Sequence, residues 1–552
     1  MTDFGYSRRK TREVPVGKVA VGGDNPIALQ SMTNTSTLDT PGSVSQIERI
    51  VEAGADIVRL TAQGRKEAAN LAEIRERLRQ NGVDVPLVAD IHFNPGAALA
   101  AAANVEKVRI NPGNYVDPGR VFKKIDFTDE EYVEEIKKID EALKPLVDVC
   151  NEHGTTLRIG VNHGSLSDRI MSRYGDTPAG MVESAMEFLR ALDRLGFHRV
   201  VVSIKASNVV VMTETVRRMA EAMDAEGLNF PLHLGVTEAG DGEDGRVKSA
   251  VGIGSLLLQG LGDTIRVSLS EEPEAEIEPA RAIVEHIAKV REDSLSGISG
   301  NIAQGYDRFS PSRRLTLWSD SEPRVAGLDI EFDGPRFDIT ADSGDEAIAF
   351  MKSHPETTVA VGSKTPAGVL RLKAFMHRVL SEKLQNPVIL TADYSGMTYD
   401  ETAIAAAIDL GALLLDGFAD GIEIVNPDIP AEKLHSLALG ILQATRLRFS
   451  KTEYIACPGC GRTLYNLQDT LHKIKAATSH PKGLKIGVMG CIVNGPGEMA
   501  DADFGYVGAA AGKISLYKGK ECVEKNIPQE EAIPRLIELI KSCGKWTDSV
   551  ED

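Results

Sequence analysis

Three cysteines and one glutamate near the C-terminal end of the sequence have the types and the spacing of metal ligands. Cys457 and Cys460 form a C-x-x-C pair among turn-forming residues, which directs both thiols into one space. Cys491 ends an apolar run that predicts a buried strand, and the turn that begins at Asn494 would bring Glu498 to the same space. The set combines three soft sulfur ligands with one oxygen ligand that is more easily displaced. Because structural sites are normally closed by four strong ligands, this combination indicates a catalytic site.

The spacing of these residues leaves two metals open. A Cys-Pro-x-Cys-Gly segment is common in zinc ribbons, which usually show a second C-x-x-C pair or two histidines further along the chain. Here His472, His480, Cys522 and Cys543 follow without forming such a pair. Thiolates bind both zinc and iron–sulfur clusters, and the missing second pair favours a cluster. We expect Cys522 and Cys543, like Cys150, to be structural residues.

The first half of the sequence must position whatever reacts at this site, and it alternates apolar β-rich runs with amphipathic helical stretches. Eight predicted strands end near residues 32, 60, 90, 110, 161, 205, 236 and 269, and helical patterns between them include 44–53, 67–80, 130–152, 181–195 and 247–259. This alternation predicts an α/β fold that begins with a (β/α)8 TIM barrel. The catalytic groups of such a barrel lie at the C-terminal ends of its strands.

Polar and charged side chains mark those predicted strand ends. They are Arg59, Asp90, Arg109, Asn111, Arg158, Asn162, Lys205, Ser207, Glu238, Arg266 and Ser268. Five cations at one barrel mouth predict a multiply charged anionic substrate such as a diphosphate, because guanidinium groups bind phosphate oxygens in pairs. The alternative is that each arginine pairs with a neighbouring carboxylate. Glu238 is a candidate proton donor or acceptor, and its alternative role is the partner of an arginine.

The changes of pattern along the chain predict three domains. We expect the barrel over residues 1–285, an inserted α/β domain over 286–445 and a C-terminal α+β domain over 446–552. The inserted domain, either an α/β sheet or a second barrel-like unit, lacks a series of cations at its strand ends, so we expect it to be a spacer. In the last domain we expect strands over 513–517 and 521–526 and a helix over 529–542.

The composition is that of an ordinary globular protein. The chain has 552 residues, 42% of them hydrophobic, and a net charge of −18, which argues against a nucleic-acid surface. No apolar run reaches the length of a membrane span, and the first residues lack the apolar core of a secretory signal. Six cysteines in such a chain do not form a disulfide framework, so we expect a reducing cytoplasm.

Several motifs together resemble the 4-hydroxy-3-methylbut-2-enyl diphosphate synthase family, the penultimate enzyme of the methylerythritol phosphate route to isoprenoids. In the C-terminal part the motifs are CPGCGRTL at 457–464, MGCIVNGPGE at 489–498 and the segment 512–520. In the first half they are the segments 29–35, 89–93, 109–114, 158–165 and 203–208. The resemblance covers roughly residues 8–285 and 452–540, and the block between them is similar to the longer three-domain form of some bacteria and plants.

The resemblance implies an iron–sulfur oxidoreductase of isoprene biosynthesis. Its reaction would be the reductive ring-opening dehydration of 2-C-methyl-D-erythritol 2,4-cyclodiphosphate, with electrons from ferredoxin or flavodoxin. It implies a [4Fe–4S] cluster held by Cys457, Cys460, Cys491 and Glu498. The substrate would lie among Arg59, Arg109, Arg158, Lys205, Ser207, Arg266 and Ser268.

From these residues we form a hypothesis about the mechanism. Substrate displaces Glu498 from the metal, the arginines stabilise the diphosphate as the ring opens, and Glu238 delivers the proton that lets the second oxygen leave as water. In the two-domain form of the family, the cluster domain of one subunit caps the barrel of its partner in a homodimer. We expect the inserted domain to let one chain fold back on itself instead, and assembly across a homodimer is the alternative.

Two other functions fit parts of the pattern. One is a barrel enzyme for a phosphorylated or pterin-like ligand, with zinc holding the C-terminal segment together. The other is a zinc-ribbon interaction protein whose barrel is only a scaffold. The cations at the strand ends count against a scaffold, which has no need of them.

Overall fold

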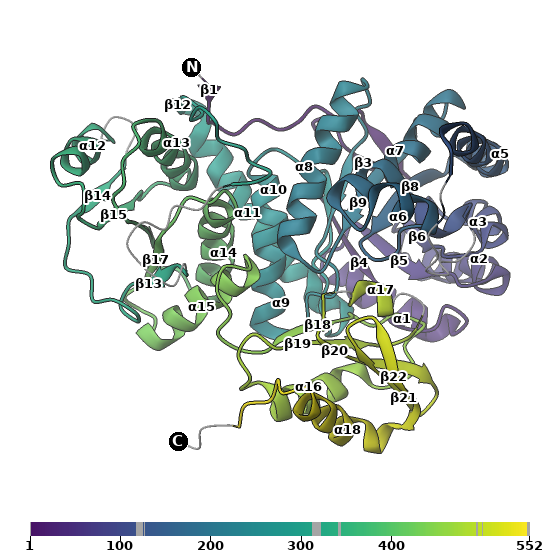
Figure 1. The fold of residues 1–552 in the computed structure, drawn as a ribbon. Coiled ribbons are helices and arrows are strands. Elements are labelled where there is room, and N and C mark those ends of the chain that lie inside the picture. The colour runs from purple at the N-terminus through teal and green to yellow at the C-terminus, as the bar shows by residue number, and fades with distance from the viewer. Residues whose placement is uncertain are drawn as a thin grey trace. The chain divides into compact units, whose positions relative to one another are not determined.

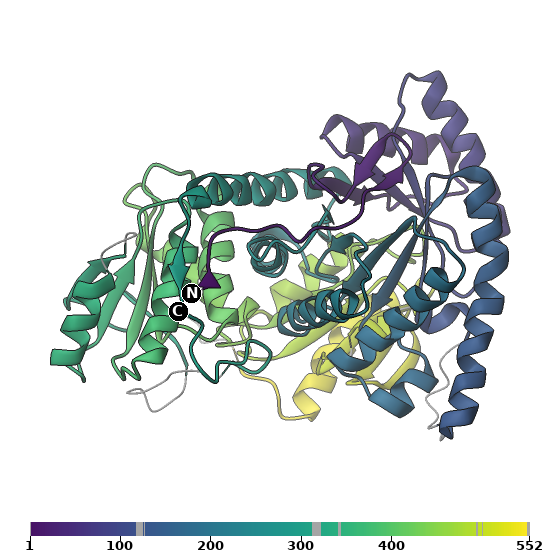
Figure 2. The ribbon, with the colours of Figure 1, turned by 90° about the horizontal axis from the view of Figure 1, so that it is seen from above.

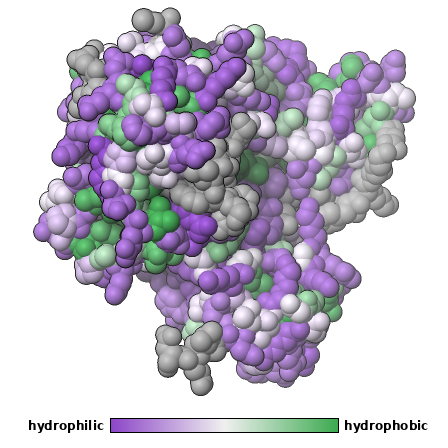
Figure 3. Space-filling model, turned by 60° about the vertical axis from the view of Figure 1, so that its left-hand side comes forward, coloured by the Kyte–Doolittle hydropathy of each residue, from purple (hydrophilic) through white to green (hydrophobic). Residues whose placement is uncertain are grey.

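The structure is a computed structural model that describes residues 2–117, 125, 127–311, 322–339, 344–492, 495–499 and 501–548. Asn494, where the predicted turn begins, lies outside these residues. The chain forms two compact units, one of residues 10–245, 262–280 and 451–552 and the other of residues 1–9, 246–261 and 281–450 (Figure 1). Within the described ranges, no helix has the length and apolar character needed to cross a membrane. On the face drawn in Figure 3, hydrophilic residues surround small groups of apolar ones.

A closed barrel of eight parallel strands forms the core of the first of these units, which confirms the predicted TIM barrel. In barrel order from the first strand along the chain, the strands are β4 (Ala28–Met32), β5 (Ile57–Thr61), β6 (Leu87–Asp90), β7 (Lys107–Ile110), β8 (Thr156–Asn162), β9 (Val200–Lys205), β10 (Leu232–Leu234) and β11 (Thr264–Ile265). Strand β11 pairs with β4 to close the ring. The strands are buried on both faces, which explains their continuous apolar runs.

Helices connect the strands and cover the outside of the barrel. They are α1 (Thr40–Glu52), α2 (Arg65–Gln80), α3 (Pro95–Ala102), α4 (Pro112–Tyr115), α5 (Asp129–His153), α6 (Asp168–Tyr174), α7 (Pro178–Arg194) and α8 (Val209–Ala225). Helix α5, seen in blue along its length in Figure 2, begins with a capping box between Thr128 and Glu131 and ends at Gly154 in the left-handed conformation. These local signals explain why the predicted range 130–152 lies within one residue of the helix ends.

A hairpin before the barrel covers its N-terminal end. Strands β2 (Val14–Val16) and β3 (Val19–Val21) pair antiparallel, and Val14, Val16 and Val21 pack against Ile57 and other barrel residues in one buried cluster. The hairpin was not among the predicted elements. The hairpin does not reach the C-terminal ends of the strands, where the predicted site residues lie.

The C-terminal part of the same unit, residues 451–548, is a five-stranded mixed sheet with helices, which we call the cysteine module. Strands β18 (Glu453–Ala456), β19 (Lys485–Met489), β20 (Phe504–Ala510), β21 (Lys513–Lys518) and β22 (Glu521–Pro528) lie side by side in chain order. Helices α16 (Leu467–Thr478) and α18 (Gln529–Ser542) belong to the module, and the short α17 (Gly495–Glu498) precedes β20. Strand β20 takes up most of the glycine-rich stretch. A Cβ atom on Gly505 would lie 2.4 Å from the Met499 sulfur, so a side chain here would require the Met499 side chain to move.

In the part of the second unit that the structure describes, the five-stranded sheet is open and does not close into a second barrel. The five strands of this sheet are parallel, in the order β13 (Arg324–Val325), β17 (Gly421–Val425), β16 (Val388–Asp393), β15 (Val359–Gly362) and β14 (Arg336–Asp338). Its helices include α12 (Gly344–Ser353), α13 (Gly368–Ser381), α14 (Tyr399–Leu415) and α15 (Ala431–Ala444). Helix α11 (Ile277–Asp293) contributes His286, which contacts Asp409 of α14 at 2.7 Å.

Candidate functional site

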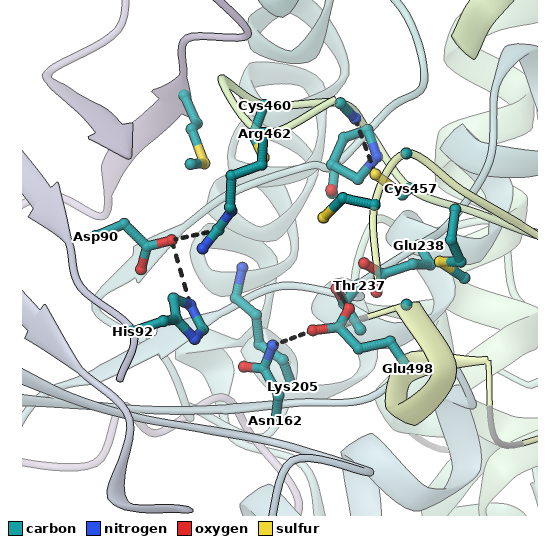
Figure 4. Close-up of a pocket in the computed structure, with 18 of the residues that line it drawn as sticks. Asp90, His92, Asn162, Lys205, Thr237, Glu238, Cys457, Cys460, Arg462 and Glu498 are labelled. Carbon is teal, nitrogen blue, oxygen red and sulfur yellow. Dashed lines mark hydrogen bonds and ion pairs between the residues drawn. The ribbon is translucent and has the colours of Figure 1, made fainter. Parts of the chain in front are cut away.

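A cavity of about 90 Å³ lies where the C-terminal ends of the barrel strands meet the cysteine module. Twelve of the residues predicted for the site line it, namely Arg59, Asp90, Arg109, Asn162, Lys205, Glu238, Arg266, Ser268, Cys457, Cys460, Cys491 and Glu498. Figure 4 shows cysteine side chains on one side of this space and barrel side chains on the other. The structure therefore brings the predicted metal ligands and most of the predicted anion-binding residues to one place within one chain.

Two of the predicted cations are held by carboxylates of the protein. Arg109 donates to Asp90 at 3.0 Å and to the Asn162 side-chain oxygen at 3.0 Å. Arg266 forms a two-pronged ion pair with Glu276, at 2.9 and 2.7 Å. The pairing that was the alternative for each arginine is therefore found for these two residues. Their guanidinium groups are fixed in direction before any substrate binds.

Arg59, Lys205 and Arg158 have no such ion pair among the residues that the structure describes. The Arg59 guanidinium faces the sulfur of Met32 at 2.8 and 2.9 Å. Burial, and then the nearby Arg266 and other cations, lower the pKa of Arg59 to about 10 although Asp90 opposes the shift. Burial and Arg59 likewise bring the pKa of Lys205 well below its ordinary value. A bound anion would stabilise the charged forms of these groups.

Arg158 lies on β8 in register with Arg109 of β7. Its side chain is buried and does not line the cavity, and its Nε and Nη1 atoms have no hydrogen-bond partner within the described part of the chain. Burial, followed by the charge of Arg59, lowers its pKa well below the ordinary value. The charged form of Arg158 would therefore be stabilised by an anion bound nearby.

Asn111 and Ser207 also do not line the cavity, and both have contacts inside the protein. The Asn111 side-chain oxygen accepts from the backbone N–H of Gly113 at 3.1 Å and so caps α4. The Ser207 hydroxyl donates to the backbone carbonyl of Glu498 at 3.3 Å. Ser207 thus holds the cysteine module to the barrel.

The two glutamates of the site lie close together and differ in their contacts. Glu498 accepts from the Asn162 side-chain amide at 2.5 Å and from the Thr237 hydroxyl at 3.1 Å. Glu238 is buried, its Oε2 atom lacks a partner among the described residues, and no ion pair links it to an arginine there. Burial, and then the charge of Glu498, raises the pKa of Glu238 well above its ordinary value. This environment favours the protonated form of Glu238, which is the form that a general acid requires.

The loop that carries Cys457 and Cys460 is organised around sulfur. The Gly459 backbone N–H donates to the Cys457 sulfur at 3.3 Å, and the Cys460 backbone N–H donates to the Thr463 hydroxyl at 3.0 Å. The charges of Cys460 and Asp90 raise the pKa of Arg462 against the effect of burial, and Arg462 lies 3.6 Å from Asp90.

Backbone N–H groups and a cation directed at cysteine sulfurs are typical surroundings of an iron–sulfur cluster. The donor set of three thiols and one carboxylate around one cavity fits such a group, although no described trio of His, Cys, Asp or Glu is close enough to hold a single ion.

Sequence reasoning missed several residues of the cavity wall, among them His92, Thr237 and Arg462. Figure 4 shows Arg462 reaching from the cysteine loop toward Asp90, and His92 faces the same carboxylate oxygen. Burial and the adjacent Arg109 lower the pKa of His92 to about 4, so His92 is neutral at pH 7. Its position two residues after Asp90 at a strand end, and that of Arg462 two residues after Cys460, were the available signals.

Contacts of the cysteine module with the barrel surround the cavity. The backbones of Gly164 and Gly497 touch, since a Cβ atom on Gly164 would lie 2.0 Å from the Gly497 carbonyl oxygen. Ala239 and Ala456 form a parallel β-bridge. At the edge, Lys520 contacts Asp176 at 3.3 Å. The module and the barrel of one chain therefore enclose the site together.

Two family models match the chain, the GcpE TIM-barrel domain over residues 11–281 and the GcpE protein C-terminal domain over residues 453–542. A 4-hydroxy-3-methylbut-2-en-1-yl diphosphate synthase (flavodoxin) of Bacteroides fragilis is 52% identical, over 99% of this chain and 97% of the relative. The protein of the same name from Porphyromonas gingivalis is 47% identical, over 99% of both. Among solved structures, dihydropteroate synthase of Burkholderia cenocepacia matches 54% of this chain and 100% of its own, with 15% identity and a TM-score of 0.35.

Proposed function

Because this chain belongs to the GcpE family, we propose that it is a 4-hydroxy-3-methylbut-2-en-1-yl diphosphate synthase. The reaction converts 2-C-methyl-D-erythritol 2,4-cyclodiphosphate to (E)-4-hydroxy-3-methylbut-2-enyl diphosphate by a two-electron reductive dehydration. The observation that carries the proposal is the single cavity lined by three cysteines, two glutamates and the cations of the barrel strand ends. Each part of this wall has a separate task in the reaction.

The cations bind the diphosphate. Arg59 and Lys205 line the cavity and have no protein carboxylate as an ion-pair partner in the described chain, so we assign them the direct contacts with phosphate oxygens. Ser268 lines the same wall and offers a hydroxyl. The buried Arg158, which does not line the cavity, stabilises the same negative charge at longer range. These groups stabilise the diphosphate as the ring C–O bond breaks and it becomes an open-chain group.

The paired arginines position other groups and bind substrate less directly. Arg109 connects Asp90 with Asn162, and Asn162 in turn donates to Glu498. Arg266 is fixed by Glu276. We therefore expect conservative substitution of Asp90 to disturb Glu498 through this chain of hydrogen bonds.

The cofactor is a [4Fe–4S] cluster, which Cys457, Cys460, Cys491 and Glu498 would hold. When bound, it supplies electrons one at a time and an iron that acts as a Lewis acid. The Asn162 and Thr237 contacts hold the Glu498 carboxylate on the barrel side, a position that leaves this ligand displaceable. Glu238 delivers a proton to the oxygen that leaves as water, from the protonated form that its buried position favours.

The names of the relatives and the fold support proposals for the electron donor, the exclusion of water and the oligomeric state. The name of the relatives includes flavodoxin, and we propose flavodoxin, with ferredoxin as the alternative, as the electron donor in a reducing cytoplasm. The cysteine module covers the barrel mouth and excludes water from the reacting atoms. A homodimer is compatible with a site that one chain completes by itself.

The test is turnover of the cyclodiphosphate by anaerobically purified protein with dithionite as reductant, together with iron and sulfide content. We expect close to four iron and four sulfide per chain, and a Glu238→Gln variant that keeps the cluster but loses turnover by about 10²- to 10⁴-fold. Glu130→Gln, an exposed position on α5, is the matched control and should behave as the wild type. Tightly bound zinc without sulfide after reconstitution would refute the proposed function, and undiminished turnover of Glu238→Gln would refute its role as the acid.

A further inference from the structure

The loop of Cys457–Gly461 separates two spaces. On its inner side is the cavity of the active site, and on its outer side is a groove of about 340 Å³ that opens to the surface. Pro458, Gly459 and Cys460 line both spaces. At this place the wall between the predicted cluster ligands and the outside is therefore one loop thick.

Exposed apolar side chains lie beside this groove. Leu38 is 51% exposed, Leu464 is 37% exposed and Ile492 is 54% exposed. The Leu464 backbone N–H donates to the Gly490 carbonyl at 3.1 Å, which places Leu464 beside the segment of Cys491 and Ile492. We call Leu38, Leu464, Ile492 and the groove the reductant face.

The groove itself connects Leu38 with the cysteine loop. Ser36 lines the groove, and its hydroxyl accepts from the Leu38 backbone N–H at 3.3 Å. A Cβ atom on Gly461 would lie 3.4 Å from the Ser36 Cα atom, so the two loops are in contact. Glu271 and Glu272 lie at the edge of the same groove. The face thus combines exposed apolar residues with a polar rim, as protein interfaces do.

Among the residues that the structure describes, the barrel side of the cavity offers no comparable approach. Asn162, Arg109 and Glu238 are buried there, and the Cys457 carbonyl is covered by the Ser270 hydroxyl at 2.8 Å. Electrons pass between the prosthetic groups of two proteins only over a short distance. The carrier protein therefore has to bind at the surface nearest the sulfur ligands. Cys460 is the ligand that borders the outer groove.

We propose that the reductant face is the docking surface of the one-electron carrier protein, a flavodoxin-type protein, and this rests on the proposed function. In each of two encounters the carrier is oxidised by one electron. The two electrons and two protons reduce one substrate molecule, two C–O bonds break, and one oxygen leaves as water. A small, partly apolar contact suits such a transient encounter, because the carrier must leave after each transfer.

The test uses the double variant Leu38→Glu with Leu464→Glu in the anaerobically purified, cluster-containing protein. Neither side chain lines the active-site cavity. The matched control is Val133→Glu, which is 55% exposed on α5. The affinity for a purified bacterial flavodoxin in its oxidised form is measured by calorimetric titration, and turnover is measured with reduced flavodoxin and with dithionite and methyl viologen.

We expect the double variant to bind flavodoxin at least about tenfold more weakly. Its turnover with dithionite and methyl viologen should stay within about twofold of wild type. For Val133→Glu, the flavodoxin affinity and both turnover rates should stay within about twofold of wild type. Flavodoxin affinity equal to that of wild type would overturn the proposal. If the double variant loses iron, Leu38→Glu alone, which leaves the cysteine loop intact, is measured under the same criteria. Absence of turnover by wild type with the small reductants would instead refute the proposed function.

Discussion

Gly164 illustrates how a single residue controls the closure of the site. Its backbone has a φ of +79° and touches Gly497, immediately before Glu498. Gly154, at the end of α5, has a similar φ of +72°, yet a Cβ atom there would meet nothing within 4 Å. The two glycines therefore share the same backbone strain on substitution and differ in steric contact.

We predict that Gly164→Ala lowers kcat/KM by about a hundredfold, because the added methyl group pushes Glu498 away from the barrel. Gly154→Ala should cost only about 1 kcal/mol of stability through backbone strain and keep its activity. The measurements are turnover with dithionite and the thermal midpoint of both variants. Equal activities in the two variants would show that the contact between Gly164 and Gly497 does not matter for catalysis.

At this scale the sequence predicted which residue types gather at the barrel mouth but not their division of labour. Arg109 and Arg59 look alike as strand-end arginines. Only the structure shows that Arg109 is held by Asp90 while Arg59 faces the sulfur of Met32. That difference depends on side-chain directions across neighbouring strands, which periodicity does not contain.

Among the elements, the hairpin of β21 and β22 joins the cysteine module to the loop after α6. Asp176 accepts from Lys520 at 3.3 Å and lies 3.2 Å from the His163 ring nitrogen. Asp176 raises the pKa of His163 against the effect of burial, and His163 in turn lowers the pKa of Asp176 from 3.8 to about 2. The cluster is thus an ion pair with an ammonium group at its side.

This ion pair predicts a pH dependence of stability. The raised pKa of His163 stabilises the fold below pH 6.5, and this contribution is lost as the pH rises through the folded pKa. The lowered pKa of Asp176 stabilises it above pH 3.8, and that contribution is lost as the pH falls toward 2. Asp176→Asn should therefore lower the thermal midpoint most between about pH 4 and 6.5, by an amount that corresponds to about 1 kcal/mol. A difference from wild type that does not change between pH 5 and 8 would contradict this assignment.

Helices and strands could be predicted from the sequence where local signals such as caps and periodic apolar residues mark them. Helix α18 follows its predicted range, Gln529–Ser542, residue for residue. Strand β20 was predicted only as a glycine-rich stretch. Its glycines lie against Met499 and Gly490, which belong to other segments, and such contacts are not visible in a local sequence pattern. The hairpin of β2 and β3 was missed because its short strands show little periodicity.

For the whole molecule, the main result is that barrel and cysteine module of one chain belong to the same compact unit. The sequence predicted the barrel because its pattern repeats eight times. It predicted that the module closes on its own barrel and kept closure on the barrel of a partner as the alternative. The contacts that decide between them, such as Gly164 with Gly497, join residues far apart in the sequence.

Completion of the site within one chain predicts the outcome of a complementation experiment. Glu238→Gln and Cys491→Ser should each be inactive, one through loss of the acid and the other through loss of a metal ligand. Their mixture, or their co-expression, should remain inactive, because each chain combines its own barrel with its own module. Recovery to about a quarter of wild-type turnover, as random pairing of crossed sites would give, would demonstrate assembly across two chains.

One backbone angle has a consequence for how this protein would change under selection. Glu238 has a φ of 48°, in the left-handed region that favours glycine, and its side chain is a carboxyl group buried beside Glu498. Glycine at this position would relieve about 1 kcal/mol of backbone strain and would remove the buried carboxyl group as well. A laboratory screen for heat resistance alone should therefore enrich Glu238→Gly, whereas a screen for growth that depends on isoprenoids should eliminate it. At this position, thermal stability and catalytic turnover therefore favour different residues.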